Sequence, residues 1–192
     1  TSVWGGVAHI SATMDGPNRI SHLNTINTFL CGDLDGAAVP QEMISMIGHL
    51  KSSPAKVEIR PNIRQDMWDK FVFLATLAGM TCLMRADIGT IMATRQGKMH
   101  IEQLLAECTA IAGAEGFPPN PEALARYHAQ LTDPTSTTTA SMLRDIRAAR
   151  PVEGSHILGD LVSRSATHSI DAPLLSLCLD HVEAYERARN AS

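Results

Sequence analysis

The chain has 192 residues and a formal net charge of −4, from 20 acidic and 16 basic side chains. That length suits one domain, or one domain with part of another, since a domain commonly has about 150 residues. The hydrophobic content of 44% excludes wholesale disorder. The mild acidic excess argues against a nucleic acid or an anionic membrane as a partner. Aromatic residues supply only 4%, while Ala, Leu and the 9 Met favour helices.

The first 35 residues have the pattern of β-structure. Every second residue from 8 to 14 is apolar and the residues between are mostly polar, which predicts a half-buried strand. Residues 15–18 form a turn signal, and a second extended run covers 20–29. Because two or three strands make a poor domain alone, we interpret them as the end of a larger sheet.

From about residue 39 the pattern is helical. Gly116 followed by two prolines predicts a helix end, and Asn120 before Pro121 predicts a cap and the first turn of the next helix. The uncharged run 71–84 is shorter than the roughly 20 residues of a membrane span, so we expect a helix buried in protein. A short strand is expected at 56–59, and helices at 41–51, from about 62, and at 99–115, 121–131, 141–150, 155–168 and 173–189.

The cysteines and histidines give no sign of a metal site. Cys31, Cys82, Cys108 and Cys178 lie far apart, and we interpret them as reduced core thiols of a cytoplasmic protein, with disulfides as the weaker interpretation. Cys178 and His181 are one helical turn apart, but no second pair completes a zinc site, so we expect no metal. Residues 1–6 resemble neither a secretory nor a transit signal.

Lys70 is the most unusual residue of the helix that begins near residue 62. Positions 63, 67, 70, 74, 77 and 78 share one helical face, and all of them except Lys70 are apolar. An unpaired buried charge would be costly there. Spacing alone favours an amine that reaches water beside Asp66 or Asp69. The alternative is a lysine in a cleft, poised to donate a proton.

Ser141 and Glu153 are less distinctive. Ser141 opens a predicted helix, where a serine is most often a cap, and Glu153 follows Pro151, where a carboxylate would suit a helix N-terminus. The sequence contains no nucleophile elbow, and its glycine pairs do not form the GxGxxG fingerprint of dinucleotide-binding loops. Residue patterns alone therefore lead no further than a buried lysine in a helical domain.

Three separated stretches, in order, resemble the ketopantoate reductase (2-dehydropantoate 2-reductase) family: GGVAHISA at 5–12, NIRQDMWDKF at 62–71 and SMLRDIRA at 141–148. The resemblance extends to about Glu186. It implies reduction of a 2-keto acid to a 2-hydroxy acid with NADPH, as in pantothenate biosynthesis. It also implies an N-terminal Rossmann domain joined to a helical domain similar to the C-terminal domain of 6-phosphogluconate dehydrogenases.

The resemblance sets the expected fold class and domains. The chain would be mainly α, with residues 1–37 as closing strands of a nucleotide-binding domain and 38–192 as the helical substrate and catalytic domain. The glycine fingerprint would precede residue 1, so we expect a fragment that is inactive alone and lacks most of the NADPH (NADP) site.

The resemblance also assigns roles to three residues. Lys70 matches the catalytic lysine, which acts as general acid toward the ketone oxygen. Ser141 matches a serine that hydrogen-bonds the substrate. Glu153 matches a glutamate that orients both substrate and lysine.

Three positions depart from the family. Leu74 and Ala78 replace asparagines that many members carry four and eight residues after the lysine, and Leu158 replaces another common asparagine. An apolar side chain does not replace an amide that binds a hydroxyl group. We therefore expect either a reductase for a 2-keto acid more apolar than ketopantoate or a weak ketopantoate reductase.

Two other functions fit the helical composition. One is a non-catalytic module that dimerises or binds a partner, and the other is a relative that reduces imines, as opine dehydrogenases do. A catalytic role for Lys70 would separate the reductase from the module. The sequence does not distinguish NADPH from NADH, and apolar surface left exposed on an isolated helical domain would favour a homodimer.

Overall fold

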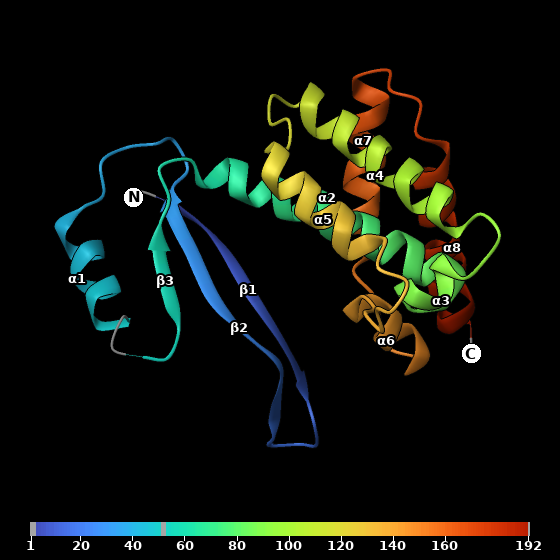
Figure 1. Ribbon diagram of the computed structural model, residues 1–192, viewed down its shortest axis with the longest axis horizontal. Coiled ribbons are helices and arrows are strands. Elements are labelled where there is room, and N and C mark those ends of the chain that lie inside the picture. Colours follow the sequence, from blue (N-terminus) through green and yellow to red (C-terminus); the bar gives the residue numbers. More distant parts are fainter. Residues whose placement is uncertain (1–2, 51–52, 192) are drawn as a thin grey trace. The chain divides into compact units, whose positions relative to one another are not determined.

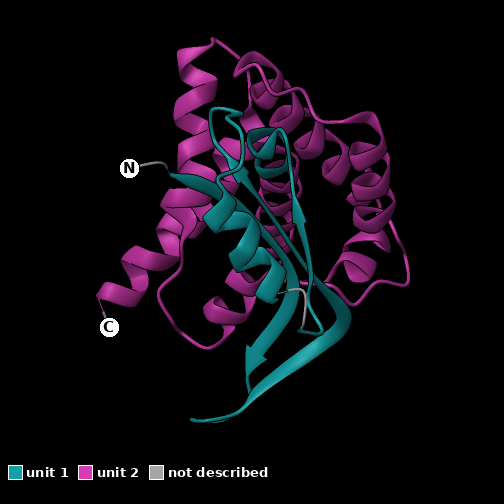
Figure 2. Ribbon diagram, turned by 90° about the vertical axis from the view of Figure 1, so that its left-hand side faces the viewer, with its two compact units in different colours: residues 1–67 teal, residues 68–192 magenta. Residues whose placement is uncertain are grey.

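The computed structural model describes residues 3–50 and 53–191 (Figure 1). They form two compact units, Thr1–Met67 and Trp68–Ser192 (Figure 2), and helix α2 (Ile63–Met84) contributes to both. The mainly helical fold preceded by a short β segment is confirmed. Residues 38–67 group with the opening strands in unit 1. That residues 1–37 are the closing strands of a nucleotide-binding domain, and that the helical domain begins at residue 38, stays a prediction.

Unit 1 is a three-stranded sheet with one crossover helix. Strands β1 (Trp4–Met14) and β2 (Ile20–Asp33) are antiparallel, and β3 (Lys56–Ile59) lies parallel to β2 after helix α1 (Gln41–Leu50). Gly32 is needed near the end of β2 because a Cβ there would lie 2.3 Å from the carbonyl oxygen of Arg60. The crossover thus brings β3 back against β2 at this glycine.

The buried face of β1 differs from the expected one. Ile10 and Met14 are 44% and 59% exposed, whereas Val7 is buried. A Cβ on Gly5 would come within 3.0 Å of side chains of the 34–67 segment, among them Ile63 at the start of α2. The strand therefore turns the side of Gly5 and Val7 inward, and the expected burial of the even-numbered residues is wrong.

Unit 2 packs its helices around α2. They are α3 (Ile88–Met92), α4 (Gly97–Ala114), α5 (Pro121–Leu131), α6 (Ser141–Arg147), the π-helix η1 (Ser155–Gly159), α7 (Asp160–Thr167) and α8 (Pro173–Asn190). Gly79 lets α2 approach its neighbours closely, since a Cβ there would lie 2.7 Å from Leu104 of α4 and 3.2 Å from Cys178 of α8. The core contains buried side chains from every helix of unit 2, with α2, α4 and α8 contributing residues such as Met80, Leu104 and Leu175.

Helix α2 is long and apolar enough, by length and composition alone, to span a membrane. However, 56% of its most apolar stretch is buried inside the protein itself. This burial is typical of a core helix.

The cysteines lie where core thiols were expected. All four belong to the described residues and are free thiols, and those at 82, 108 and 178 are buried. Burial raises the pKa of each of these three thiols to about 12, so they stay protonated at neutral pH. Cys31 on β2 is only partly buried.

Within residues 3–50 and 53–191, four helices end in a left-handed residue, and of these only α4 ends in a glycine, Gly116. Arg85, Ala149 and Ser169 take this conformation after α2, α6 and α7, with φ of 56°, 53° and 55°. After α6 the N–H of Arg150 donates to the carbonyl of Asp145 at 2.9 Å, which closes the turn. Helix α6 therefore stops at residue 147, and its expected end at residue 150 is wrong.

Replacing Ala149 by glycine should stabilise the protein. A left-handed alanine costs about 1–2 kcal/mol, part of which glycine loses again through its freer unfolded chain, so the free energy of unfolding should rise by about 0.5–1 kcal/mol. Urea unfolding of Ala149→Gly measures this change. Ala148→Gly, one residue earlier at a negative φ of −91°, is the control and should destabilise. Equal losses in both variants would contradict the strain argument.

Candidate active site

Lys70 lies on α2, in the part that belongs to unit 2. It is half-buried, and burial lowers the pKa of its ammonium group, because a poorly solvated amine favours its neutral form. On the same face, Leu74 is 36% exposed, while Leu77 and Ala78 are buried. The apolar stripe of α2 thus reaches the surface at Lys70 and Leu74 and enters the core one turn later.

The two residues before Lys70 are fixed by the segment between α4 and α5 and by α7. The ring of Trp68 stacks on Phe117 with centroids 5.9 Å apart, and the guanidinium of Arg164 lies 5.3 Å from the Trp68 ring centre. The buried Asp69 accepts the N–H of Asn120 through Oδ1 at 3.1 Å. The contacts of Trp68 and Asp69 therefore fix the backbone position of Lys70 on α2.

The carboxylates that were expected beside an exposed Lys70 have other contacts. Asp66 Oδ2 is paired with Nε of Arg60 at 2.9 Å. Asp69 is buried rather than at the surface.

Ser141 is the first residue of α6 and is exposed. The N-cap is Ala140, so the interpretation of Ser141 as the cap is wrong. The N–H of Ala140 donates to Thr81 Oγ1 on α2 at 3.3 Å. Thr81 follows Lys70 by 81 − 70 = 11 residues, about three turns, and so lies on the same face of α2. Ser141 is thereby attached to the side of α2 that carries the lysine.

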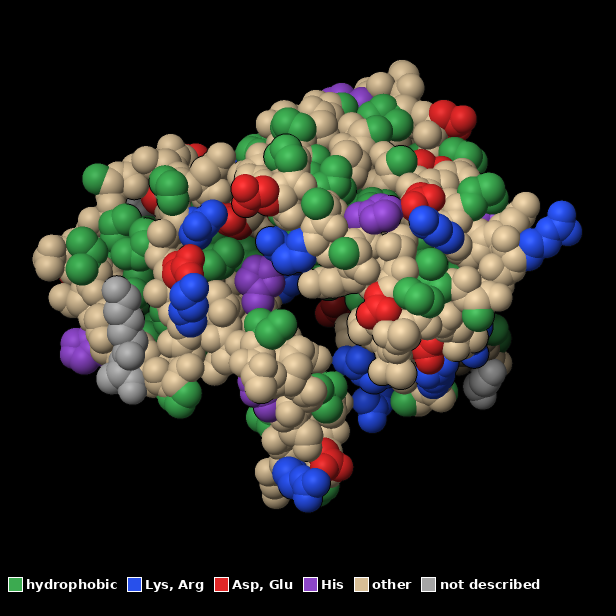
Figure 3. All heavy atoms as spheres, viewed as in Figure 1, with side chains coloured by type: hydrophobic (Ala, Val, Ile, Leu, Met, Phe, Trp, Pro, Cys, Tyr) green, Lys and Arg blue, Asp and Glu red, His purple; other side chains and the backbone are tan. Residues whose placement is uncertain are grey.

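The other end of α6 is also attached to α2. Arg147 Nη2 donates to the carbonyl of Arg85, just beyond α2, at 3.0 Å. Lys and Arg side chains gather over α6 (Figure 3), and Arg144 and Arg147 are among those in the helix. Because hydrogen bonds join both ends of α6 to α2 and the residue after it, the position of Ser141 along α2 is fixed.

Glu153 is exposed and precedes η1 by two residues. Its carbonyl accepts the N–H of Ile157 at 3.1 Å, so its backbone joins the first turn of η1. Among the described residues, Glu153 and Ser141 share no hydrogen bond or ion pair. The three predicted site residues thus come from separate elements of unit 2.

The departures from the family differ in their surroundings. Leu158 has no exposed surface and Ala78 is 3% exposed, so both belong to the core. Leu74 is the one of the three with an exposed side chain. The substrate argument drawn from these positions therefore depends on Leu74.

Sequence reasoning missed a buried carboxylate, Glu107 of α4. Helix α8 begins after Ala172, which offers no side-chain acceptor for the first N–H groups. Glu107 is 8% exposed and accepts the N–H of Leu175 at 2.8 Å and of Leu174 at 3.3 Å. Its place in the apolar face of α4 was the available signal, of the same kind that singled out Lys70.

Within residues 3–50 and 53–191 two kinds of cofactor site are relevant, a metal cluster and a phosphate-binding turn in the β2–α1–β3 crossover. No cluster of three or more His, Cys, Asp or Glu that suits a metal ion occurs in residues 3–50 and 53–191. In the β2–α1–β3 crossover, Asp33 Oδ1 accepts the N–H groups of Asp35 and Ala37 at 2.9 and 3.0 Å. These amides are turned to a carboxylate, and the loop charge is negative, which does not suit a pyrophosphate.

Comparison with known proteins identifies the family. The model of the ketopantoate reductase PanE/ApbA C-terminal domain matches residues 62–186. The chain belongs to this family. It is similar to the uncharacterized oxidoreductase YkpB of Bacillus subtilis (strain 168), with 28% identity over 184 residues that cover 96% of this chain and 60% of YkpB. The chain thus spans about three fifths of this relative.

Solved structures share the fold. One is 2-dehydropantoate 2-reductase from Methylococcus capsulatus, with a TM-score of 0.85 and 23% identity, covering 100% of this chain and 65% of that one. Another is D-mandelate dehydrogenase with NADH and anilino(oxo)acetate, with a TM-score of 0.80 and 18% identity, covering 97% of this chain and 61% of that one. The fold therefore occurs both in a 2-dehydropantoate 2-reductase and in a D-mandelate dehydrogenase.

Replacing Glu107 by alanine should destabilise unit 2 strongly. Two N–H groups at the start of α8 would lose a charged acceptor, and hydrogen bonds to charged groups contribute about 1.5–3 kcal/mol each. We expect a loss of at least about 2 kcal/mol in thermal or urea unfolding. Glu107→Gln, which keeps one acceptor oxygen, should lose less. Equal stability of the alanine variant and the wild type would contradict the capping role.

Proposed function

We propose that this chain is the substrate-binding and catalytic part of a reductase that converts a 2-keto acid to a 2-hydroxy acid, of the ketopantoate reductase type. The observation that carries the proposal is Lys70, a half-buried amine with a lowered pKa, in a chain that belongs to this family. A lowered pKa brings an ammonium group closer to the range in which it releases a proton readily. An interaction module would have no use for a lysine in this stripe.

Lys70 supplies the proton of the reaction. Its ammonium group donates a hydrogen bond to the ketone oxygen and transfers one proton as the C–O double bond becomes a single bond. Ser141 donates a hydrogen bond to the substrate, and Glu153 orients substrate and lysine. The hydride that completes the reduction at C2 comes from the nicotinamide cofactor.

The cofactor is held mainly outside this chain. The β2–α1–β3 loop directs its amides to Asp33, which leaves no phosphate cradle there. We propose NADPH as the cofactor, a cytoplasmic location and a homodimer as the working form. The activity belongs to the full-length protein that contains this chain.

Leu74 favours a substrate that is more apolar than ketopantoate. It lies one turn after Lys70 on the same face and is partly exposed, where an asparagine would bind a substrate hydroxyl. An exposed leucine instead favours a substrate whose branched side chain lacks that hydroxyl.

Removing the amine tests the general acid. In the full-length protein, Lys70→Ala should lower kcat/KM for NADPH-dependent keto acid reduction by at least about 100-fold. The wild type should lose activity as pH rises through the lowered pKa of Lys70, since the acid form is required, and this alkaline limb should be absent from the variant. Lys98→Ala, an exposed lysine of α4, is the control. Full activity of Lys70→Ala would refute the general-acid role, whereas a wild type that reduces no 2-keto acid would favour the non-catalytic module.

Restoring the amide tests the substrate. Leu74→Asn should raise the preference for ketopantoate over its unhydroxylated branched analogue by about tenfold or more. The measurement is the ratio of the two kcat/KM values. Leu177→Asn, at a leucine of α8 that is 51% exposed, should leave the ratio unchanged. A wild type that strongly prefers ketopantoate would refute the apolar-substrate proposal.

A further inference from the structure

The segment that carries Glu153 has no regular helix or strand at residues 150–153. It runs from Arg150, after α6, to Gly154, which already has the helical dihedrals of the turn that leads into η1. Side chains at the ends of such segments are mobile unless the backbone is held. What holds this backbone therefore decides where the Glu153 carboxylate lies.

Every second residue of the segment contacts α8. The hydroxyl of Tyr185 donates to the carbonyl of Arg150 at 2.7 Å, and the N–H of Val152 donates to Glu186 Oε1 at 2.8 Å. Gly154 packs on Val182 so closely that a Cβ would lie 2.3 Å from its Cγ1.

The three α8 residues form one face of the helix. Val182, Tyr185 and Glu186 are spaced i, i+3 and i+4, which places them side by side. Residues 150, 152 and 154 are thus held against α8, and Glu153, which lies between the last two of them, is exposed.

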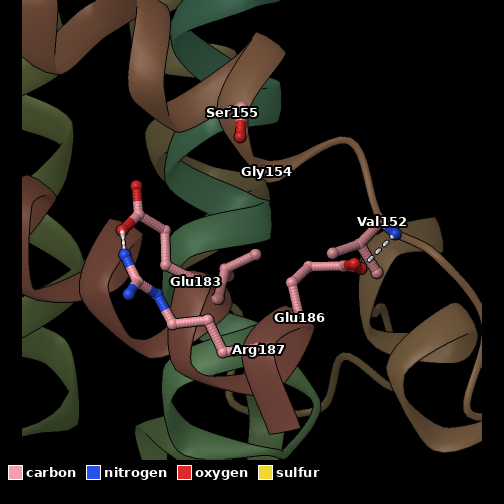
Figure 4. A pocket seen from close by; sticks show the side chains of 7 residues that line it. Val152, Gly154, Ser155, Glu183, Glu186 and Arg187 are labelled. Carbon is pink, nitrogen blue, oxygen red and sulfur yellow. Dashed lines mark hydrogen bonds and ion pairs between the residues drawn. The ribbon is translucent and has the colours of Figure 1, made fainter. Parts of the chain in front are cut away.

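Glu186 is the central contact and is itself fixed. Its Oε2 accepts a hydrogen bond from Nη2 of Arg189, one turn along α8, at 2.9 Å. Arg189 and the N–H of Val152 lower the pKa of the Glu186 carboxyl, so it is ionised at neutral pH. Figure 4 shows this carboxylate directed at the Val152 nitrogen, whereas Glu183 on the same helix is directed at Arg187.

We propose that Glu186 is a positioning residue of the reductase, which sets the place of Glu153 by holding the N–H of the residue before it. The inference rests on the proposed function, because it acts through the role of Glu153. Its contribution is to the orientation of the substrate and Lys70, where a displacement of about 1 Å reduces the rate on the order of 100-fold.

The test compares three variants of the full-length protein, with NADPH and the 2-keto acid that the wild type reduces best. Glu186→Ala removes the acceptor and should lower kcat/KM by about 10- to 100-fold. Glu186→Gln keeps an oxygen at the same place and should return kcat/KM to within about threefold of the wild type. Glu183→Ala, with an ion pair to Arg187 at 3.8 Å, is the matched control and should leave kcat/KM unchanged.

A second comparison separates positioning from general stability. In a Glu153→Gln background, Glu186→Ala should add less than about twofold, because its effect passes through Glu153. The same loss in both backgrounds would overturn the proposal. Wild-type kcat/KM in Glu186→Ala would overturn it and leave the proposed function intact, whereas a wild type without reductase activity would overturn both.

Hydrogen exchange gives a readout that needs no variant. In the wild-type protein the Val152 amide should exchange more slowly than the Glu153 amide, because only the former is held by Glu186. Equal exchange rates of the two amides would overturn the proposal even if Glu186→Ala did not fold.

Discussion

The buried carboxylate of Glu107 is the constraint on which the candidate site depends. Placing an acid in an apolar helix face is favourable only where it is well hydrogen-bonded, and the N-terminus of α8 together with Gln103 of α4 supplies that bonding. Glu107 thereby fixes α8 against α4 inside the core. Because α8 in turn holds the segment before η1, an interaction deep in unit 2 defines the position of an exposed residue, Glu153.

Much of the helical architecture was predictable from local pattern. The strand Lys56–Ile59 and the helix Pro121–Leu131 lie at their expected limits, since β-branched residues and a cap–proline pair mark them. The short α3 was missed because five residues give no periodicity. The predicted helix at 155–168 is η1 followed by α7, and a π-helix does not follow the 3.6-residue period that predicts helices.

Less of the candidate site was predictable. Lys70 stood out because a cation interrupts an apolar stripe, but Ser141 and Glu153 were identified only through the family resemblance. Their attachments join residues far apart in sequence, such as Ala140 to Thr81 and Val152 to Glu186. Similarly, Arg85, Ala149 and Ser169 gave no sign of helix ends, because the left-handed turn is usually marked by glycine. Each of these depends on tertiary contacts that local sequence does not record.

The alternate contacts between α8 and residues 150–154 limit how this segment can diverge among relatives. Exchange of the intervening residues, such as Pro151, leaves every contact with α8 in place. Insertion or deletion of one residue would move the N–H of residue 152 away from Glu186 or the glycine away from Val182, so that at least one of these contacts would be lost. The segment therefore tolerates changes of composition far better than changes of length, and its length is a better marker of a working site than its sequence.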